Sequence, residues 1–178
     1  YVALRRNPVP RTTIHELLWP ESDGDRQAQN YRRALSNLRQ FFETHGTGLV
    51  LESSPTSIAL IPDTVAVDVH TFRQAARIAM DQRLLPGLIA AADLYSGPLW
   101  QDGPEDWILA ERQELEELFS QVVGEMTHQF AEAGEHKEAV RHARAAVVKA
   151  PLREDVHACL NRAYGRAGMG SEALKQFE

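Results

Sequence analysis

Several kinds of residue are scarce in this sequence, and each scarcity narrows what the protein can be. The chain of 178 residues contains one cysteine, Cys159, which excludes an internal disulfide framework. Aromatic residues make up only 7%, and no apolar run approaches the twenty residues of a membrane helix. The opening YVALRRNPVP lacks the pattern of a secretory signal. We therefore predict a cytoplasmic protein that does not enter a membrane.

The charges are distributed unevenly along the chain. Its 19 Lys and Arg against 25 Asp and Glu give a formal net charge of −6. Residues 1–62 carry 7 basic and 6 acidic side chains, a net of +1, and residues 63–178 carry 12 and 19, a net of −7. The acidity therefore belongs to the second part. We predict two domains, 1–62 and 63–178, of which the first is the better suited to a polyanion.

Negative charge is almost missing from one segment, DRQAQNYRRALSNLRQFF, residues 25–42. It contains four arginines and no acidic side chain after its first residue. Apolar residues recur in it at i, i+4, i+7 and i+11, which predicts a helix with one stripe facing a core. The members of this stripe are Tyr31, Leu35, Leu38 and Phe42.

The opposite face of this helix carries arginine and amide side chains only. On it lie Arg26, Gln29, Arg33, Asn37 and Gln40, with Asn30, Arg32 and Ser36 on the flanks. Arginine pairs with guanine edges or phosphates and amides pair with adenine, whereas a polyanion would repel a carboxylate. The pattern fits DNA recognition, which the turn before this helix and the hairpin after it favour. The alternative is a solvated basic face on a structural helix, and Arg32 and Arg39 suit phosphate contacts or surface ion pairs.

A helix before this segment and a hairpin after it complete a larger motif. Thr13 and Glu16 fit a capping box that starts a helix, and Pro20 ends that helix. LVLESSPTSIALI predicts two short strands around a turn, in which Leu49 and Leu51 oppose Ile58 and Leu60. A helix-turn-helix followed by a hairpin is a winged helix. The hydroxyls of the turn, Thr56 among them, suit phosphate contacts and are equally ordinary turn residues.

Only helices are predicted from Asp68 onward, and part of this region repeats. The helices are expected at about 69–81, 86–96, 105–132, 136–149, 152–167 and from 171 onward. Six matches share an offset of 34 residues: Leu118/Leu152, Met126/Leu160, Phe130/Tyr164, Ala133-Gly134/Ala167-Gly168, Glu138-Ala139/Glu172-Ala173 and Val140/Leu174. This period is typical of tetratricopeptide helix pairs. We predict a mainly α fold, a winged helix-turn-helix followed by an all-α, tetratricopeptide-like repeat domain.

Taken together, the segments resemble a known family. The chain resembles the Streptomyces antibiotic regulatory protein family in six segments. They are HELLWPES, NYRRALSNLRQFF, DVHTFRQAAR, AADLYSGPLW, EDWILAERQELEELF and AGEHKEAVRHARAAVVKAPLREDVHACL. Its members are transcription activators with a response-regulator-type winged helix followed by a bacterial transcriptional activator domain. The chain begins at YVALRRN, near the end of that family's first helix, and stops within a repeat at Gln176-Phe177-Glu178. We therefore expect a fragment whose winged helix is truncated at its N-terminus.

The resemblance implies a function that involves no catalysis. It implies a transcription activator that binds direct repeats near promoters, with the recognition helix in the major groove and the wing on the backbone. The helical repeats would serve homodimerisation or contact with RNA polymerase. The candidate DNA-binding residues are Arg26, Gln29, Asn30, Arg32, Arg33, Asn37 and Thr56.

Other functional classes have less support in the sequence. The histidines of the repeat region lack the HExxH spacing of a metalloenzyme, and no glycine-rich phosphate loop is present. We expect no catalytic residue, metal or cofactor. The remaining alternative is a regulatory interaction module, in which the repeats bind a peptide or signalling protein and the winged helix does not bind DNA.

Overall fold

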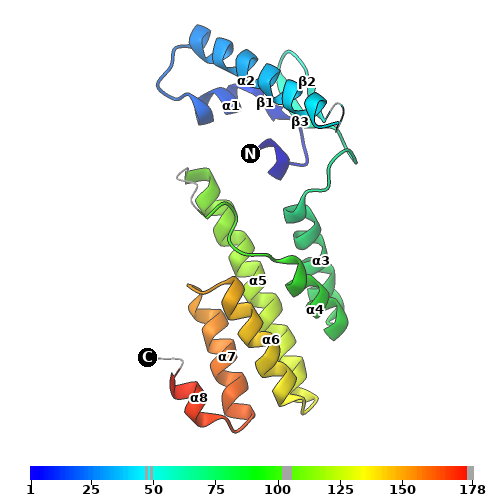
Figure 1. Cartoon of the computed structure of the whole chain (residues 1–178), viewed down its shortest axis with the longest axis vertical. Coiled ribbons are helices and arrows are strands. Elements are labelled where there is room, and N and C mark those ends of the chain that lie inside the picture. The colour runs from blue at the N-terminus through cyan, green and yellow to red at the C-terminus, as the bar shows by residue number, and fades with distance from the viewer. Residues whose placement is uncertain (47, 49, 102–105, 176–178) are drawn as a thin grey trace. The chain divides into compact units, whose positions relative to one another are not determined.

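The chain forms two compact units in a computed structural model that describes residues 1–46, 48, 50–101 and 106–175 (Figure 1). The first unit is Tyr1–Val67 and the second starts at Asp68. The segment that joins them follows the last strand of the first unit and contains Pro62, where the sequence analysis divides the domains. Each unit has its own core and is described separately.

The first unit contains two helices and a small antiparallel sheet. In chain order its elements are a 3-10 helix η1 (Val2–Leu4), β1 (Val9–Pro10), α1 (Arg11–Leu18), α2 (Gly24–Thr44), β2 (Leu51–Ser53) and β3 (Ser57–Leu60). The strand order is β1-β3-β2. The predicted helices and hairpin are present, with Leu51 opposite Leu60. The sequence did not predict β1, because two residues, one of them a proline, carry no alternation.

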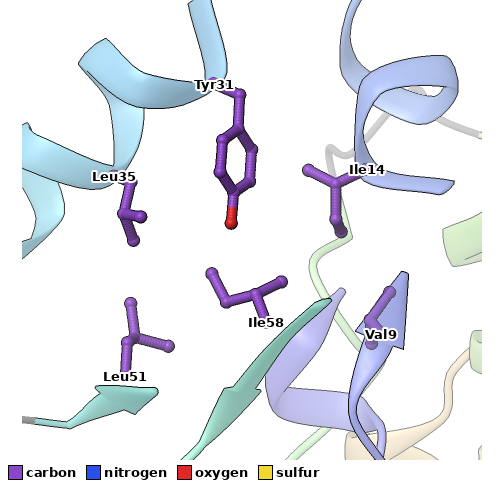
Figure 2. Packing of buried hydrophobic residues seen from close by; sticks show 6 residues of the cluster. All are labelled: Val9, Ile14, Tyr31, Leu35, Leu51 and Ile58. Carbon is purple, nitrogen blue, oxygen red and sulfur yellow. The ribbon is translucent and has the colours of Figure 1, made fainter. Parts of the chain in front are cut away.

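The core of this unit lies between α2, α1 and the sheet (Figure 2). Its buried members are Val9, Ile14, Tyr31, Leu35, Leu51 and Ile58. Tyr31 and Leu35 are 3% and 8% exposed, as the stripe predicts, and Phe42 is partly buried against the cluster. The prediction was wrong for Leu38, which is 45% exposed and takes no part in the cluster. Leu49, predicted to pair across the hairpin, lies outside the described residues.

The start of α1 also differs from the prediction. Pro10 is the N-cap and no side chain caps the helix, so the capping box at Thr13 and Glu16 was wrong. The chain enters α1 directly from β1, and the Arg11 backbone N–H donates to the Thr56 carbonyl at 2.9 Å. Pairing with the hairpin therefore sets the start of the helix, a long-range effect that a local motif does not contain.

The second unit consists of helices in its described residues. They are α3 (Asp68–Gln82), α4 (Leu85–Leu94), α5 (Asp106–Glu132), α6 (His136–Lys149), α7 (Glu154–Arg166) and α8 (Gly170–Lys175). The described ends agree with the predicted ones to within two residues. The long helix α5 contacts α3, α4, α6 and α7 (Figure 1). Its residues Phe119 and Val123 are fully buried, and the Phe119 ring stacks on Tyr95 with centroids 4.1 Å apart.

The 34-residue offset recurs in the backbone. Gly134 and Gly168 both adopt the left-handed region, with φ of 75° and 72°. In each case the next residue donates back to an aromatic residue, Glu135 N–H to Phe130 O at 2.8 Å and Met169 N–H to Tyr164 O at 2.9 Å. These are the left-handed glycine ends of α5 and α7. The same left-handed glycine turn therefore ends α5 and α7, the first helices of the two helix pairs.

Two of the matched positions do not pack as the repeat predicts. Val140 is 6% exposed, whereas Leu174, 34 residues later, is 73% exposed. Leu152, the counterpart of the half-buried Leu118, is 90% exposed. Leu152 and Leu174 are therefore exposed, although their matched partners Leu118 and Val140 are at least half-buried. No neighbouring helix among the described residues covers them.

Polar side chains also join the helices of this unit. Arg73 of α3 donates to Glu111 of α5 at 2.6 Å, and Glu111 is only 6% exposed. The Lys149 ammonium donates to the Ala92 carbonyl at the end of α4, at 2.8 Å. A cation at a helix C-terminus satisfies carbonyls that have no intrahelical partner. These contacts hold α3 and α4 against the repeat helices.

We expect Phe119→Ala to destabilise the second unit by about 3–5 kcal/mol, because it removes a fully buried ring at the centre of α5 and leaves a cavity. Urea unfolding followed by far-UV circular dichroism measures the loss. Leu109→Ala on the same helix is the control, because Leu109 is 44% exposed and its truncation should change stability by less than about 1 kcal/mol. Equal losses in the two variants would contradict this account of the core.

Tyr95 gives a prediction with a pH dependence. Burial raises the pKa of Tyr95 to about 12, and the Glu116 carboxylate acts in the same direction. Its hydroxyl is buried without a hydrogen-bond partner among the described residues. The folded state holds the Tyr95 phenol neutral, whereas the unfolded chain ionises it near pH 10. The free energy of unfolding is therefore unaffected below pH 10 and falls as the pH rises towards 12.

We expect Tyr95→Phe to preserve or slightly raise the stability at pH 7, by up to about 1 kcal/mol, since it removes an unsatisfied polar group. The variant should also lose less stability between pH 10 and 12 than the parent chain. Thermal unfolding of both proteins across this range measures both effects. A large loss at pH 7 would show that the hydroxyl has a stabilising partner.

Candidate nucleic-acid interface

The candidate interface is the outward face of α2, and local chemistry at both ends of the helix defines its length. The Asp23 carboxylate accepts a hydrogen bond from the Arg26 backbone N–H at 2.8 Å, which caps the N-terminus. At the other end, Gly46 adopts a φ of 71°, so the chain turns away after Thr44. Between these signals α2 runs for 21 residues.

The structure brings most of the candidate residues together on this face. Arg26, Gln29, Arg32, Arg33 and Asn37 are exposed on α2, and Asn30 is half-buried. Thr56 is exposed as well, but it belongs to the hairpin turn and not to the helix. Because Tyr31 and Leu35 hold the opposite side of α2 in the core, the helix cannot rotate without exposing them.

The arginines of this face are not neutralised by neighbours. Within the described part of the chain, Arg26, Arg32, Arg33 and Arg39 form no ion pair. The acidic residues of α2 are confined to its ends, Asp25 in the first turn and Glu43 near the last. Exposed, unpaired guanidinium groups along one helix face create a positive potential that attracts anions.

The hairpin turn is stabilised by its own side chains. The Ser54 hydroxyl accepts from the Ser57 N–H at 2.9 Å and from the Thr56 N–H at 3.2 Å, and the Ser54 N–H donates to the Ser57 carbonyl at 2.9 Å. Such bonds are characteristic of serine-containing turns. The Thr56 side chain is thus presented at the tip of an ordered turn.

Ser53 connects the hairpin to both helices, a role that the sequence analysis did not find. The Arg11 guanidinium donates to Ser53 Oγ at 3.0 Å, and the Tyr31 hydroxyl lies 3.2 Å from the same oxygen. Arg11 also lies over the Tyr31 ring, 5.0 Å from its centroid. Strand β2, α1 and α2 therefore meet at one hydroxyl. No local signal indicates a contact between residues 42 positions apart.

The described residues contain no metal-binding cluster, no low-pKa thiol and no membrane-length helix. Among them, no group of three or more His, Cys, Asp or Glu side chains could hold a metal ion. Burial raises the pKa of the Cys159 thiol, which keeps it neutral and unreactive at neutral pH. None of the helices in the described ranges is long and apolar enough to cross a membrane.

Comparison with protein families identifies the second unit. The model of the bacterial transcriptional activator domain matches residues 67–178, well over half of the chain. The chain belongs to this family. Family membership makes the protein a regulator of the transcription-activator type, and the matched region coincides with the helical unit that starts at Asp68. No curated protein matches the chain.

The family match leaves the first unit to be interpreted from its own geometry. Residues 1–66 lie outside the matched region, so the winged helix and the candidate DNA-binding residues stay predictions. In the resembled activators a bacterial transcriptional activator domain follows the winged helix, and this is the part of the resemblance that the match supports.

We expect Ser53→Ala to destabilise the first unit by about 1–2 kcal/mol, because it leaves Arg11 and the Tyr31 hydroxyl without their shared partner. Chemical unfolding monitored by tyrosine fluorescence measures the loss. Ser36→Ala is the control, since Ser36 is exposed on α2 and forms no hydrogen bond within the described chain. If both variants were equally stable, Ser53 would not connect the hairpin to the helices.

Proposed function

We propose that this protein is a sequence-specific DNA-binding transcription activator whose helix α2 enters the major groove of duplex DNA. The observation that carries the proposal is the face of α2 opposite Tyr31 and Leu35. It presents exposed arginine and amide side chains, and its arginines form no ion pair within the described chain. These are the side chains that read base edges and contact phosphates.

The dimensions of α2 suit the major groove. Arg26 and Asn37 are eleven residues apart, which is about 16 Å along an α-helix and corresponds to about five base pairs. A groove about 12 Å wide admits one helix. An α-helix that follows a short turn and precedes a hairpin has the docking arrangement of a helix-turn-helix.

The candidate residues divide into two roles under this proposal. The exposed Arg33 and Arg26 are the first base-reading candidates, followed by Asn37 and the half-buried Asn30. Arg32, on the flank of this face, suits contacts nearer the backbone, and Gln29 remains a further candidate on the outer face. Thr56, at the tip of the hairpin turn, would donate to a phosphate oxygen as the wing touches the backbone.

The helical unit supplies the activating part. We propose that its helix pairs are tetratricopeptide-like and serve self-association as a homodimer or contact with RNA polymerase in the cytoplasm. The recurrence of the left-handed glycine turn after 34 residues supports this assignment. A net charge of −7 over residues 63–178 would keep the unit away from the DNA backbone. Binding at direct repeats near promoters would place two copies side by side.

We expect Arg33→Ala to weaken binding to a preferred duplex by ~1–3 kcal/mol and to relax the preference at one base pair. A phosphate contact such as Arg32 would instead act on all sequences, and Arg32→Ala should reduce the salt slope by about one unit. Duplexes selected from a randomised library by the full chain, followed by anisotropy titrations at two salt concentrations, measure both effects.

Arg77→Ala is the matched control for these titrations. Arg77 is exposed on α3 and forms no ion pair within the described ranges, so its removal changes net charge without touching α2. The proposal fails if Arg26→Ala and Arg33→Ala bind duplex like the parent chain. It also fails if the parent shows no salt-dependent affinity, a result that would favour a protein-interaction module.

A further inference from the structure

A cavity of about 300 Å³ lies between α5 and α7, on the helical unit and apart from the candidate nucleic-acid interface. Its α5 wall includes Gly124 and Ala131, and its α7 wall includes Ala163. Those side chains are small, so the two helices leave room between them. This volume is at the lower end of that of ligand pockets and corresponds to one or two side chains.

The polar groups at the floor of this cavity have no need of a polar ligand. The Thr127 hydroxyl, which faces it, already donates to the Val123 carbonyl at 2.8 Å. Burial raises the pKa of the Cys159 thiol, which therefore stays neutral. A methyl group at Gly124 would lie 3.9 Å from the Cys159 sulfur, in ordinary contact. The floor thus provides apolar surface of small, closely spaced groups.

The rim of the cavity is cationic, although the unit is acidic overall. His128, Arg162 and Arg166 line it. Arg166 pairs with Glu132 at 3.3 Å, but Arg162 has no carboxylate partner in the described part of the chain. Among the described residues, its guanidinium donates one hydrogen bond, to the Cys159 sulfur at 3.1 Å. A neutral thiol is a weak acceptor, so most of the donors of Arg162 stay available.

No acidic side chain lines the cavity among the described residues, and carboxylates on the same two helices have other partners. Asp155 pairs with Arg153, and Glu125 accepts from both Arg83 and Gln129. None of them neutralises Arg162. The cavity is therefore a place where an unpaired cation stands next to apolar surface.

We propose that this groove binds an acidic peptide segment of a partner protein, with an aspartate or glutamate carboxylate on Arg162 and an adjacent apolar side chain in the cavity. Arginine pairs with a carboxylate through two parallel hydrogen bonds, which orients the ligand as well as attracting it. The apolar floor then selects segments in which acidic and apolar residues alternate. The inference goes beyond the proposed DNA-binding function and does not depend on it.

The charge of the surroundings selects a short peptide over a nucleic acid. Residues 63–178 carry a net charge of −7, which repels an extended polyanion at long range. A peptide with one or two carboxylates experiences mainly the local cation. Its apolar side chain uses the floor, for which a phosphate backbone has no complement.

An array of random twelve-residue peptides probed with the full chain tests the proposal. We expect the bound peptides to be enriched in aspartate or glutamate next to an apolar residue. Arg162→Ala should weaken a selected peptide at least tenfold in solution, and Arg162→Lys should weaken it less. Arg141→Ala is the control, because Arg141 pairs with Glu138 on the exposed side of α6 and should leave the affinity unchanged.

A second variant separates the groove from surface charge. Ala131→Leu places a larger side chain in the cavity while every cation is kept, and we expect it to weaken peptide binding at least tenfold with an unchanged circular dichroism spectrum. The proposal is overturned if no peptide binds, if the bound peptides lack carboxylates, or if Arg162→Ala binds them normally. It is also overturned if Arg162→Ala lowers duplex affinity instead. Peptide and duplex titrations are independent, so each proposal can fail alone.

Discussion

The packing of Tyr31 and Leu35 against the hairpin sheet is the interaction on which the first unit depends. These two side chains pack with Ile14 and Ile58 in one buried cluster. Burying each apolar side chain contributes about 1.5–3 kcal/mol to stability, before the loss of conformational entropy on folding is subtracted. The same contact determines which side of α2 faces solvent. Because apolar residues take one side of the helix, the arginines lie on the outer face and its flanks, where they form no ion pair within the described part of the chain.

The second unit is organised differently, because its shorter helices pack against one long helix. Helix α5 is buried along most of one face, and α3, α4, α6 and α7 all contact it. The turns after α5 and α7 repeat in detail, down to the left-handed glycine and the hydrogen bond back to an aromatic residue. Membership of the bacterial transcriptional activator domain family assigns a regulatory role to this unit. The packing of this unit leaves Arg162 without a carboxylate partner among the described residues.

Charge separates the two units more sharply than composition does. The first unit has almost no net charge, but the four arginines of α2 form no ion pair within the described residues. In the second unit most of the arginines named above are paired, Arg73 with Glu111, Arg83 with Glu125 and Arg153 with Asp155. Paired cations stabilise helix contacts and attract few ligands, whereas unpaired ones are available for binding. Whether an arginine can bind a ligand therefore depends on whether a nearby carboxylate already pairs with its guanidinium group.

The sequence by itself determined the helices, the described ends of those in the second unit to within two residues, the buried pair Tyr31 and Leu35, and the 34-residue repeat, because these depend on local periodicity and turn chemistry. It did not determine β1, the start of α1, the exposure of Leu38 or the bond network at Ser53. Each of these depends on which distant segment lies opposite, and no local pattern encodes that. Whether a stripe residue is covered, and whether an arginine finds a carboxylate, was decided by tertiary structure alone.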